Sequence, residues 1–173
     1  MQYLRSYTIT HLEGDPLIKK NGTLELGNHG CMKKMRPYVY RGDWVIAKLG
    51  KRFWKIKGKN REYPFTKSKG HDFDKKKYLF YAMEVTSTRG ENEKKILCSK
   101  KGSHYCFFKT PLPIKPHFFS LLTNGQSNKK IEFEENDSKL ANKFIEWIKR
   151  QKPKTSINSK TNNPVQRCRK ICY

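Results

Sequence analysis

The segment 36–48, RPYVYRGDWVIAK, constrains the fold of this chain more than any other stretch. Its Gly42-Asp43 pair favours a tight turn, because glycine tolerates positive φ and an aspartate side chain accepts hydrogen bonds from nearby backbone N–H groups. The aromatic and β-branched residues that follow favour a strand over residues 43–49. The segment therefore predicts a chain that turns sharply into a sheet, and we expect a ligand pocket beside this turn.

Hydrophobic periodicity predicts the other elements. Further strands are expected over residues 3–11, 23–26, 78–86, 94–99 and 103–109. Loops are expected over 12–22 and 50–77, and short helical or irregular segments over 31–40 and 117–123.

The last predicted element is an amphipathic helix over residues 138–150, where one side carries Leu140, Phe144, Ile145, Trp147 and Ile148. Strands first and helices last indicate an α+β fold. We expect a small mixed or antiparallel curved sheet, or a partial barrel, with the C-terminal helix packed on it.

The chain has 173 residues, which suits a single domain. We expect this domain to cover residues 1–150. From residue 151 onward the sequence turns polar and basic and contains no acid, so residues 151–173 predict a flexible basic tail.

Charge is the strongest global signal. The chain has 38 Lys and Arg against 15 Asp and Glu, a formal net charge of +23. Such a charge attracts polyanions and speeds their association. We therefore expect DNA or RNA as the partner, with a general lysine bias on every solvated face as the alternative.

Cysteine usage and hydropathy indicate the compartment. The five cysteines form no CxxC pair, the first residues lack the apolar run of a signal peptide, and no apolar segment approaches the ~20 residues that cross a bilayer. We expect a cytoplasmic protein with reduced thiols and no membrane contact.

Metal and catalytic signals are weak. His29 with Cys31, and His104 with Cys106, have a spacing that zinc sites rarely use, and no glycine-rich phosphate loop is present. We therefore expect no metal and no cofactor. The candidate catalytic residues are Asp43, His104 and Cys31, with His29 and Glu84 as further members if a pocket brings at least three of them together.

Nucleic-acid binding has better support in the segment that follows the strand predicted over residues 43–49. Between residues 51 and 80 there are eleven Lys and Arg but only three acids. Lys51, Arg52 and Lys55 are interleaved with aromatic residues, Trp54 among them. Cations neutralise phosphate and flat rings stack on unpaired bases, so this segment predicts a binding surface. The alternative is that the rings pack on the protein and the lysines are merely solvated.

Several short motifs occur together in a fixed order: GDWVI at 42–46, LFYAMEVT at 79–86 and SHYCFF at 103–108. On these residues the chain resembles the nucleotide modification associated domain of the second type, over most of residues 3–150. More distantly, it is similar to the barrel modules of the PUA, ASCH and EVE group. The resemblance implies a PUA-like fold. It also implies a role beside base-modifying enzymes, in phage or anti-phage settings, in which the domain reads a modified or flipped base.

Site roles follow from the expected pocket. Arg36 and Arg41 flank the turn and are expected to face phosphate. Asp43 is expected to accept a hydrogen bond from a base edge, with capping of the turn as the alternative. Trp44 and Tyr105 are expected to stack on a base, with packing in the core as the alternative. A nucleotide-modifying enzyme is the second hypothesis, and a structural basic RNA-binding protein, which needs no pocket, is the third.

Overall fold

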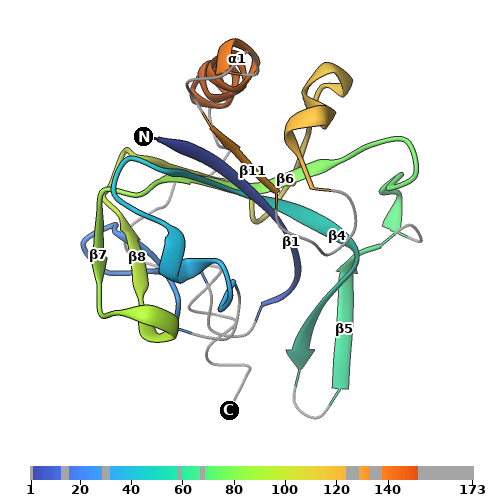
Figure 1. The fold of residues 1–173 in the computed structure, drawn as a ribbon. Coiled ribbons are helices and arrows are strands. Elements are labelled where there is room, and N and C mark those ends of the chain that lie inside the picture. Colours follow the sequence, from blue (N-terminus) through green and yellow to red (C-terminus); the bar gives the residue numbers. More distant parts are fainter. Residues whose placement is uncertain are drawn as a thin grey trace.

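The computed structural model describes residues 2–12, 16–28, 32–57, 60–66, 69–123, 129–132 and 138–151. They form an α+β fold with two sheets and one α-helix, α1 (Ser138–Arg150) (Figure 1). This confirms the predicted α+β class. The predicted tail lies almost wholly outside the described residues, as do His29 and Cys31.

The larger sheet has seven strands in the order β10-β6-β4-β1-β11, with β5 paired to β4 and β9 to β6. The bounds are β1 Tyr3–Leu12, β4 Trp44–Lys57, β5 Asn60–Phe65, β6 Tyr78–Glu84, β9 His104–Cys106, β10 Leu112–Pro113 and β11 Lys129–Glu132. Strands β1 and β4 run parallel, whereas the other neighbours are antiparallel, so the sheet is mixed.

The smaller sheet has four antiparallel strands in the order β2-β3-β8-β7. Its strands are β2 Leu17–Ile18, β3 Leu24–Leu26, β8 Ile96–Ser99 and β7 Ser87–Arg89. Within the described residues, the short 3₁₀ helices η1 Arg36–Tyr38, η3 Asn92–Lys94 and η4 Pro116–Leu121 accompany the sheets.

Each face of the larger sheet packs on its own apolar cluster. Successive strand residues point to opposite faces, so Ile46 belongs to one cluster, while Val45 and Ala47 belong to the other. Helices α1 and η4 cover the first face, and η1 with the smaller sheet covers the second (Figure 1). The central strand β6 is therefore apolar almost throughout, as a strand buried on both faces requires.

The prediction of a long loop over residues 50–77 is wrong in its first half. Strand β4 continues to Lys57 and forms a hairpin with β5, in which Phe53 and Phe65 pair across the strands with ring centroids 5.6 Å apart. The segment resembles a loop in sequence because charged residues interrupt its apolar pattern, as where the exposed Lys51 and Arg52 precede the buried Phe53.

The strands predicted at 94–99 and 103–109 also differ from a simple pair. They correspond to β8, in the smaller sheet, and β9, in the larger one, so the intervening turn carries the chain from one sheet to the other. Strands β2, β7, β10 and β11 have no counterpart in the prediction, and three of them are only two or three residues long.

Strand β4 bends strongly halfway along its length. Ile9 of β1 pairs with Leu49, and His11 pairs with Trp54, so one residue intervenes on β1 but four intervene on β4. The pairing of β4 with β6 also shifts at Ala47 and Lys48. The irregularity directs the second half of β4 away from β6 and opens a cleft along the bend.

Candidate functional site

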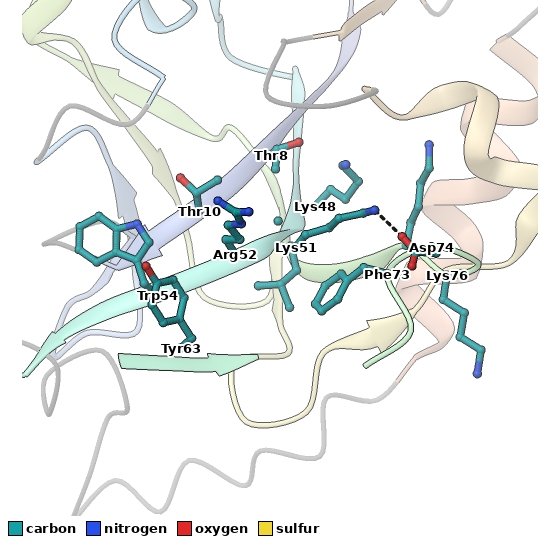
Figure 2. Close-up of a pocket in the computed structure, with 13 residues that line it drawn as sticks. Thr8, Thr10, Lys48, Lys51, Arg52, Trp54, Tyr63, Phe73, Asp74 and Lys76 are labelled. Atoms are coloured by element: carbon teal, nitrogen blue, oxygen red, sulfur yellow. Dashed lines mark hydrogen bonds and ion pairs between the residues drawn. The ribbon is translucent and has the colours of Figure 1, made fainter. Parts of the chain in front are cut away.

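A cleft of about 690 Å³ lies along the bend of β4. Strand β1 contributes two threonines, β4 contributes most of the floor, and β5 and the segment that precedes β6 contribute the remaining wall (Figure 2). The described residues that line it are Thr8, Thr10, Lys48, Leu49, Gly50, Lys51, Arg52, Trp54, Tyr63, Phe73, Asp74, Lys76 and Lys77. Its volume falls in the range of about 300–1,000 Å³ typical of ligand pockets.

The lining is strongly cationic. It has five Lys and Arg and one carboxylate, Asp74, which forms an ion pair with Lys51 (Figure 2). Within the described part of the chain, no carboxylate pairs with Lys48, Arg52 or Lys76. The cleft therefore has a surplus of positive charge that an anion can neutralise.

Lys48 is the most informative of these cations. Partial burial, and then the positive charge of Lys77, lower the pKa of Lys48 below its ordinary value. The two ammonium groups are thus close enough to repel each other. A phosphate between them would relieve that repulsion.

Three aromatic side chains line the same cleft. Trp54 is half-buried, and one face of its indole stacks on His11 with centroids 5.0 Å apart and an interplanar angle of 18°. Tyr63, on the neighbouring strand β5, is 39% exposed. Phe73 lies toward the other end of the cleft (Figure 2).

Gly50 allows β4 to approach β1 at the floor of the cleft. A Cβ atom at this position would lie 3.0 Å from Cγ2 of Thr10, 3.2 Å from Cγ2 of Thr8 and 3.1 Å from the Ile9 carbonyl oxygen. Such contacts are tighter than real Cβ atoms usually make. A side chain here would push the strands apart or fill the space between the two threonines.

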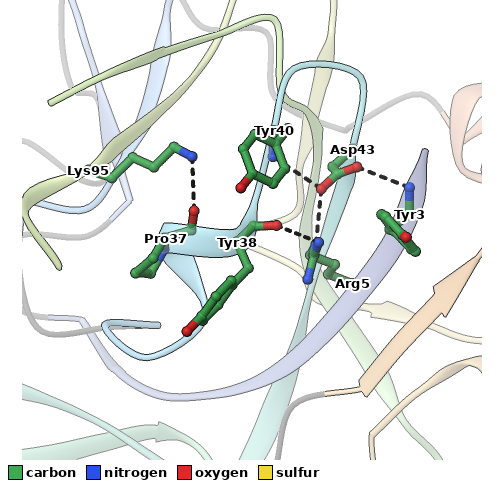
Figure 3. A network of polar contacts seen from close by, with 7 residues as sticks. All are labelled: Tyr3, Arg5, Pro37, Tyr38, Tyr40, Asp43 and Lys95. Atoms are coloured by element: carbon green, nitrogen blue, oxygen red, sulfur yellow. Dashed lines mark hydrogen bonds and ion pairs between the residues drawn. The ribbon is translucent and has the colours of Figure 1, made fainter. Parts of the chain in front are cut away.

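The predicted pocket at the Gly42-Asp43 turn is corrected by the structure. Asp43 is 1% exposed, and its carboxylate accepts hydrogen bonds from Nε of Arg5 at 3.0 Å, from the N–H of Tyr3 at 3.0 Å and from the N–H of Tyr40 at 3.1 Å (Figure 3). Arg5 also donates to the Tyr38 carbonyl. Asp43 therefore caps the turn and joins it to β1, and its oxygens are already used.

The two arginines beside the turn, Arg36 and Arg41, do not line the cleft. Arg36 is 3% exposed, and its Nη2 donates to the Glu93 carbonyl at 2.9 Å, so it is part of the interior under η1. Arg41 is exposed at the turn itself. The first residue of β4 that lines the cleft is Lys48, seven residues after Arg41.

Trp44 and Tyr105 occur together, but in a packed cluster. Their rings stack with centroids 6.3 Å apart and an interplanar angle of 22°, and Trp44 is 6% exposed in the cluster beneath α1. Nζ of Lys149, on α1, lies 6.0 Å from the centre of the Trp44 ring. The core alternative is therefore the correct one for Trp44, and Tyr105 packs half-buried against the same cluster.

The described catalytic candidates are not brought together. Asp43 is bound to Arg5, whereas Nδ1 of His104 donates to the Lys100 carbonyl at 3.1 Å. Burial lowers the pKa of His104, and burial raises the pKa of the Cys106 thiol. No hydrogen bond within the described residues joins Asp43, Glu84 and His104. The same residues contain no group of three or more His, Cys, Asp or Glu that could hold a metal ion.

The basic aromatic segment is the part of the sequence prediction that converges. Lys51, Arg52 and Trp54 all line the cleft, while the side chain of Lys55 lies outside what is described. The prediction missed Lys48, on the same strand, and the residues that other elements bring to the cleft: Thr8, Thr10, Phe73, Asp74, Lys76 and Lys77. The lysine run at 75–77 is a sequence signal for further cations near the site. No local sequence pattern, however, indicates the parallel pairing of β1 with β4.

Comparison of the chain with protein-family models, with curated proteins and with solved structures finds no match. In the described part of the chain, no helix has the length and apolar character needed to cross a membrane.

Proposed function

We propose that the protein binds nucleic acid through the cleft along the bend of β4. The observation that carries the proposal is the combination of five cations, one carboxylate and three aromatic rings in a single cleft. Cations that contact phosphates release counterions, which supplies sequence-independent affinity. Aromatic rings add base stacking, which a site for a small inorganic anion does not need.

The resemblance to base-reading barrel modules supports a finer proposal. In this proposal the domain is PUA-like, acts in the cytoplasm beside base-modifying enzymes, for example in phage defence, and recognises a modified or flipped base. An extruded base would have to reach the aromatic part of the cleft, because the turn at Asp43 is occupied by the chain's own contacts.

The concave site also separates the three hypotheses raised by the sequence. A protein that merely coats RNA needs a positive face and no cleft. A nucleotide-modifying enzyme needs reacting groups at the ligand, and the described lining contains one carboxylate, already paired with Lys51, and no histidine or cysteine. A binding role accounts for the lining with fewer requirements.

Removing two cleft charges and two distant charges in matched variants tests the proposal. The cleft variant is Arg52→Gln with Lys76→Gln, and the control is Lys139→Gln with Lys143→Gln on the exposed side of α1. All four side chains are exposed, and both variants lower the net charge equally. Affinity for a labelled oligonucleotide is measured by fluorescence anisotropy across a range of salt concentrations.

We expect the cleft variant to bind more weakly and to reduce the slope of log K against log salt by roughly 1.4–1.8, since each phosphate contact contributes about 0.7–0.9. The control variant is expected to keep nearly the wild-type slope. Equal losses in the two variants would mean that binding is spread over the whole basic surface and that the proposed site is wrong.

A further inference from the structure

Two of the three aromatic rings, Trp54 and Tyr63, lie at a different end of the cleft from Lys48 and Lys51, and Arg52 lies between them (Figure 2). The strand register agrees, because Lys48 pairs with Thr8 whereas Trp54 pairs with His11, three residues further along β1. That separation corresponds to roughly 10 Å at about 3.3 Å per residue, the scale of a base and its adjoining phosphate.

The aromatic end is held in place before any ligand binds. His11 covers one face of the Trp54 indole in a nearly parallel stack, which fixes the plane of the ring. Trp54 nevertheless lines the cleft, so part of its surface remains available there. A ring that is already ordered loses little conformational entropy when a base stacks on it.

The cationic end suits a phosphate more than a carboxylate or a neutral group. Lys48 and Lys77 repel each other, and Arg52, which has no ion-pair partner within the described residues, lies between Lys48 and the rings of Trp54 and Tyr63. A group with more than one negative oxygen can contact several of these cations at once.

We propose that the cleft takes an unpaired nucleotide of a single strand, with its base on Trp54 and Tyr63 and its phosphate at Lys48, Lys77 and Arg52. This inference rests on the proposed nucleic-acid binding and specifies its substrate. In a duplex the base faces are covered by their neighbours, so rings inside a cleft can stack only on a base that has left the helix. Single-stranded nucleic acid presents such bases without the cost of unpairing.

The experiment compares one labelled oligonucleotide of about 12 residues, within the roughly 4–16 nucleotides that one small domain covers, alone and annealed to its complement. Affinities are measured for the wild-type protein, Trp54→Leu and Tyr63→Leu. Tyr38→Leu serves as the matched control, because the Tyr38 side chain is 65% exposed and lies outside the cleft. Circular dichroism verifies the fold of each variant, and the exposed position of Tyr63 keeps the test decisive if Trp54→Leu does not fold.

We expect the single strand to bind at least about tenfold more tightly than the duplex. Each cleft variant is expected to weaken single-strand binding by roughly 5- to 100-fold, the loss of one stacked base, and Tyr38→Leu to leave it unchanged. Equal or tighter duplex binding, or unchanged single-strand binding by Tyr63→Leu, would overturn the inference while leaving the nucleic-acid proposal intact. Failure to bind either form would refute both.

Discussion

Replacing Asp43 with Asn tests whether this residue is structural, as its burial indicates, or contacts a ligand, as the sequence alone suggests. The carboxylate is 1% exposed and bonds to Arg5 and to two backbone N–H groups (Figure 3). Asparagine has nearly the same shape but carries no charge and has one acceptor oxygen instead of two. The variant therefore leaves the Arg5 guanidinium buried without a counter-ion and loses at least one hydrogen bond.

The expected cost follows from the burial of both partners. The side chains of Arg5 and Asp43 are 5% and 1% exposed, so water cannot replace the lost carboxylate. Removing one partner of a buried pair costs about 3–5 kcal/mol of unfolding free energy. Because a chain of this size loses about 2–4 °C in Tm per kcal/mol, we expect a drop of roughly 6–20 °C.

Urea unfolding followed by circular dichroism measures this change. Glu146→Gln is the matched control, since its pair with Lys149 is exposed on α1 and is expected to contribute at most about 1 kcal/mol. A loss below about 1 kcal/mol in Asp43→Asn, particularly with weaker oligonucleotide binding, would refute the structural assignment and restore the pocket at the turn.

Two further predictions concern single positions. Lys48→Met is expected to raise Tm at pH 7, because the lowered pKa of Lys48 means that the folded state disfavours its charge. As the pH rises above the folded-state pKa of Lys48, the wild-type protein gains stability, since its unfolded state still binds the proton. The Tm advantage of the variant is therefore expected to shrink as the pH approaches 10.5. An advantage that grows with pH would contradict this. Gly27→Ala is expected to lose more unfolding free energy than Gly102→Ala. The backbone at Gly27 has φ +126°, and a Cβ there would lie 2.7 Å from the Lys95 carbonyl oxygen, whereas a Cβ at Gly102 has no atom within 4 Å. The overpacking term is roughly 1–3 kcal/mol, and equal losses in urea unfolding would contradict it.

Part of the candidate site was predictable from local sequence. The clustering of Lys51, Arg52 and Trp54 is visible because these residues are neighbours on one strand. The roles of Arg36 and Trp44 were not predictable in the same way, since an arginine before a turn and a tryptophan at a strand start look alike whether they face solvent or the interior. Burial depends on which element packs against them, here η3, whose Glu93 carbonyl accepts a hydrogen bond from Arg36, and α1 for Trp44.

By itself the sequence determined the period-two strands, the amphipathic helix α1, the sharp turn before β4 and the large positive charge, because each depends on residues close together along the chain. Only the tertiary structure decided where the cleft lies. Its walls come from β1, β4, β5 and the segment before β6, and their alignment depends on the parallel β1–β4 pairing and on the three extra residues at the bend of β4. Pairing between distant strands is set by packing of the whole core, which no local pattern encodes.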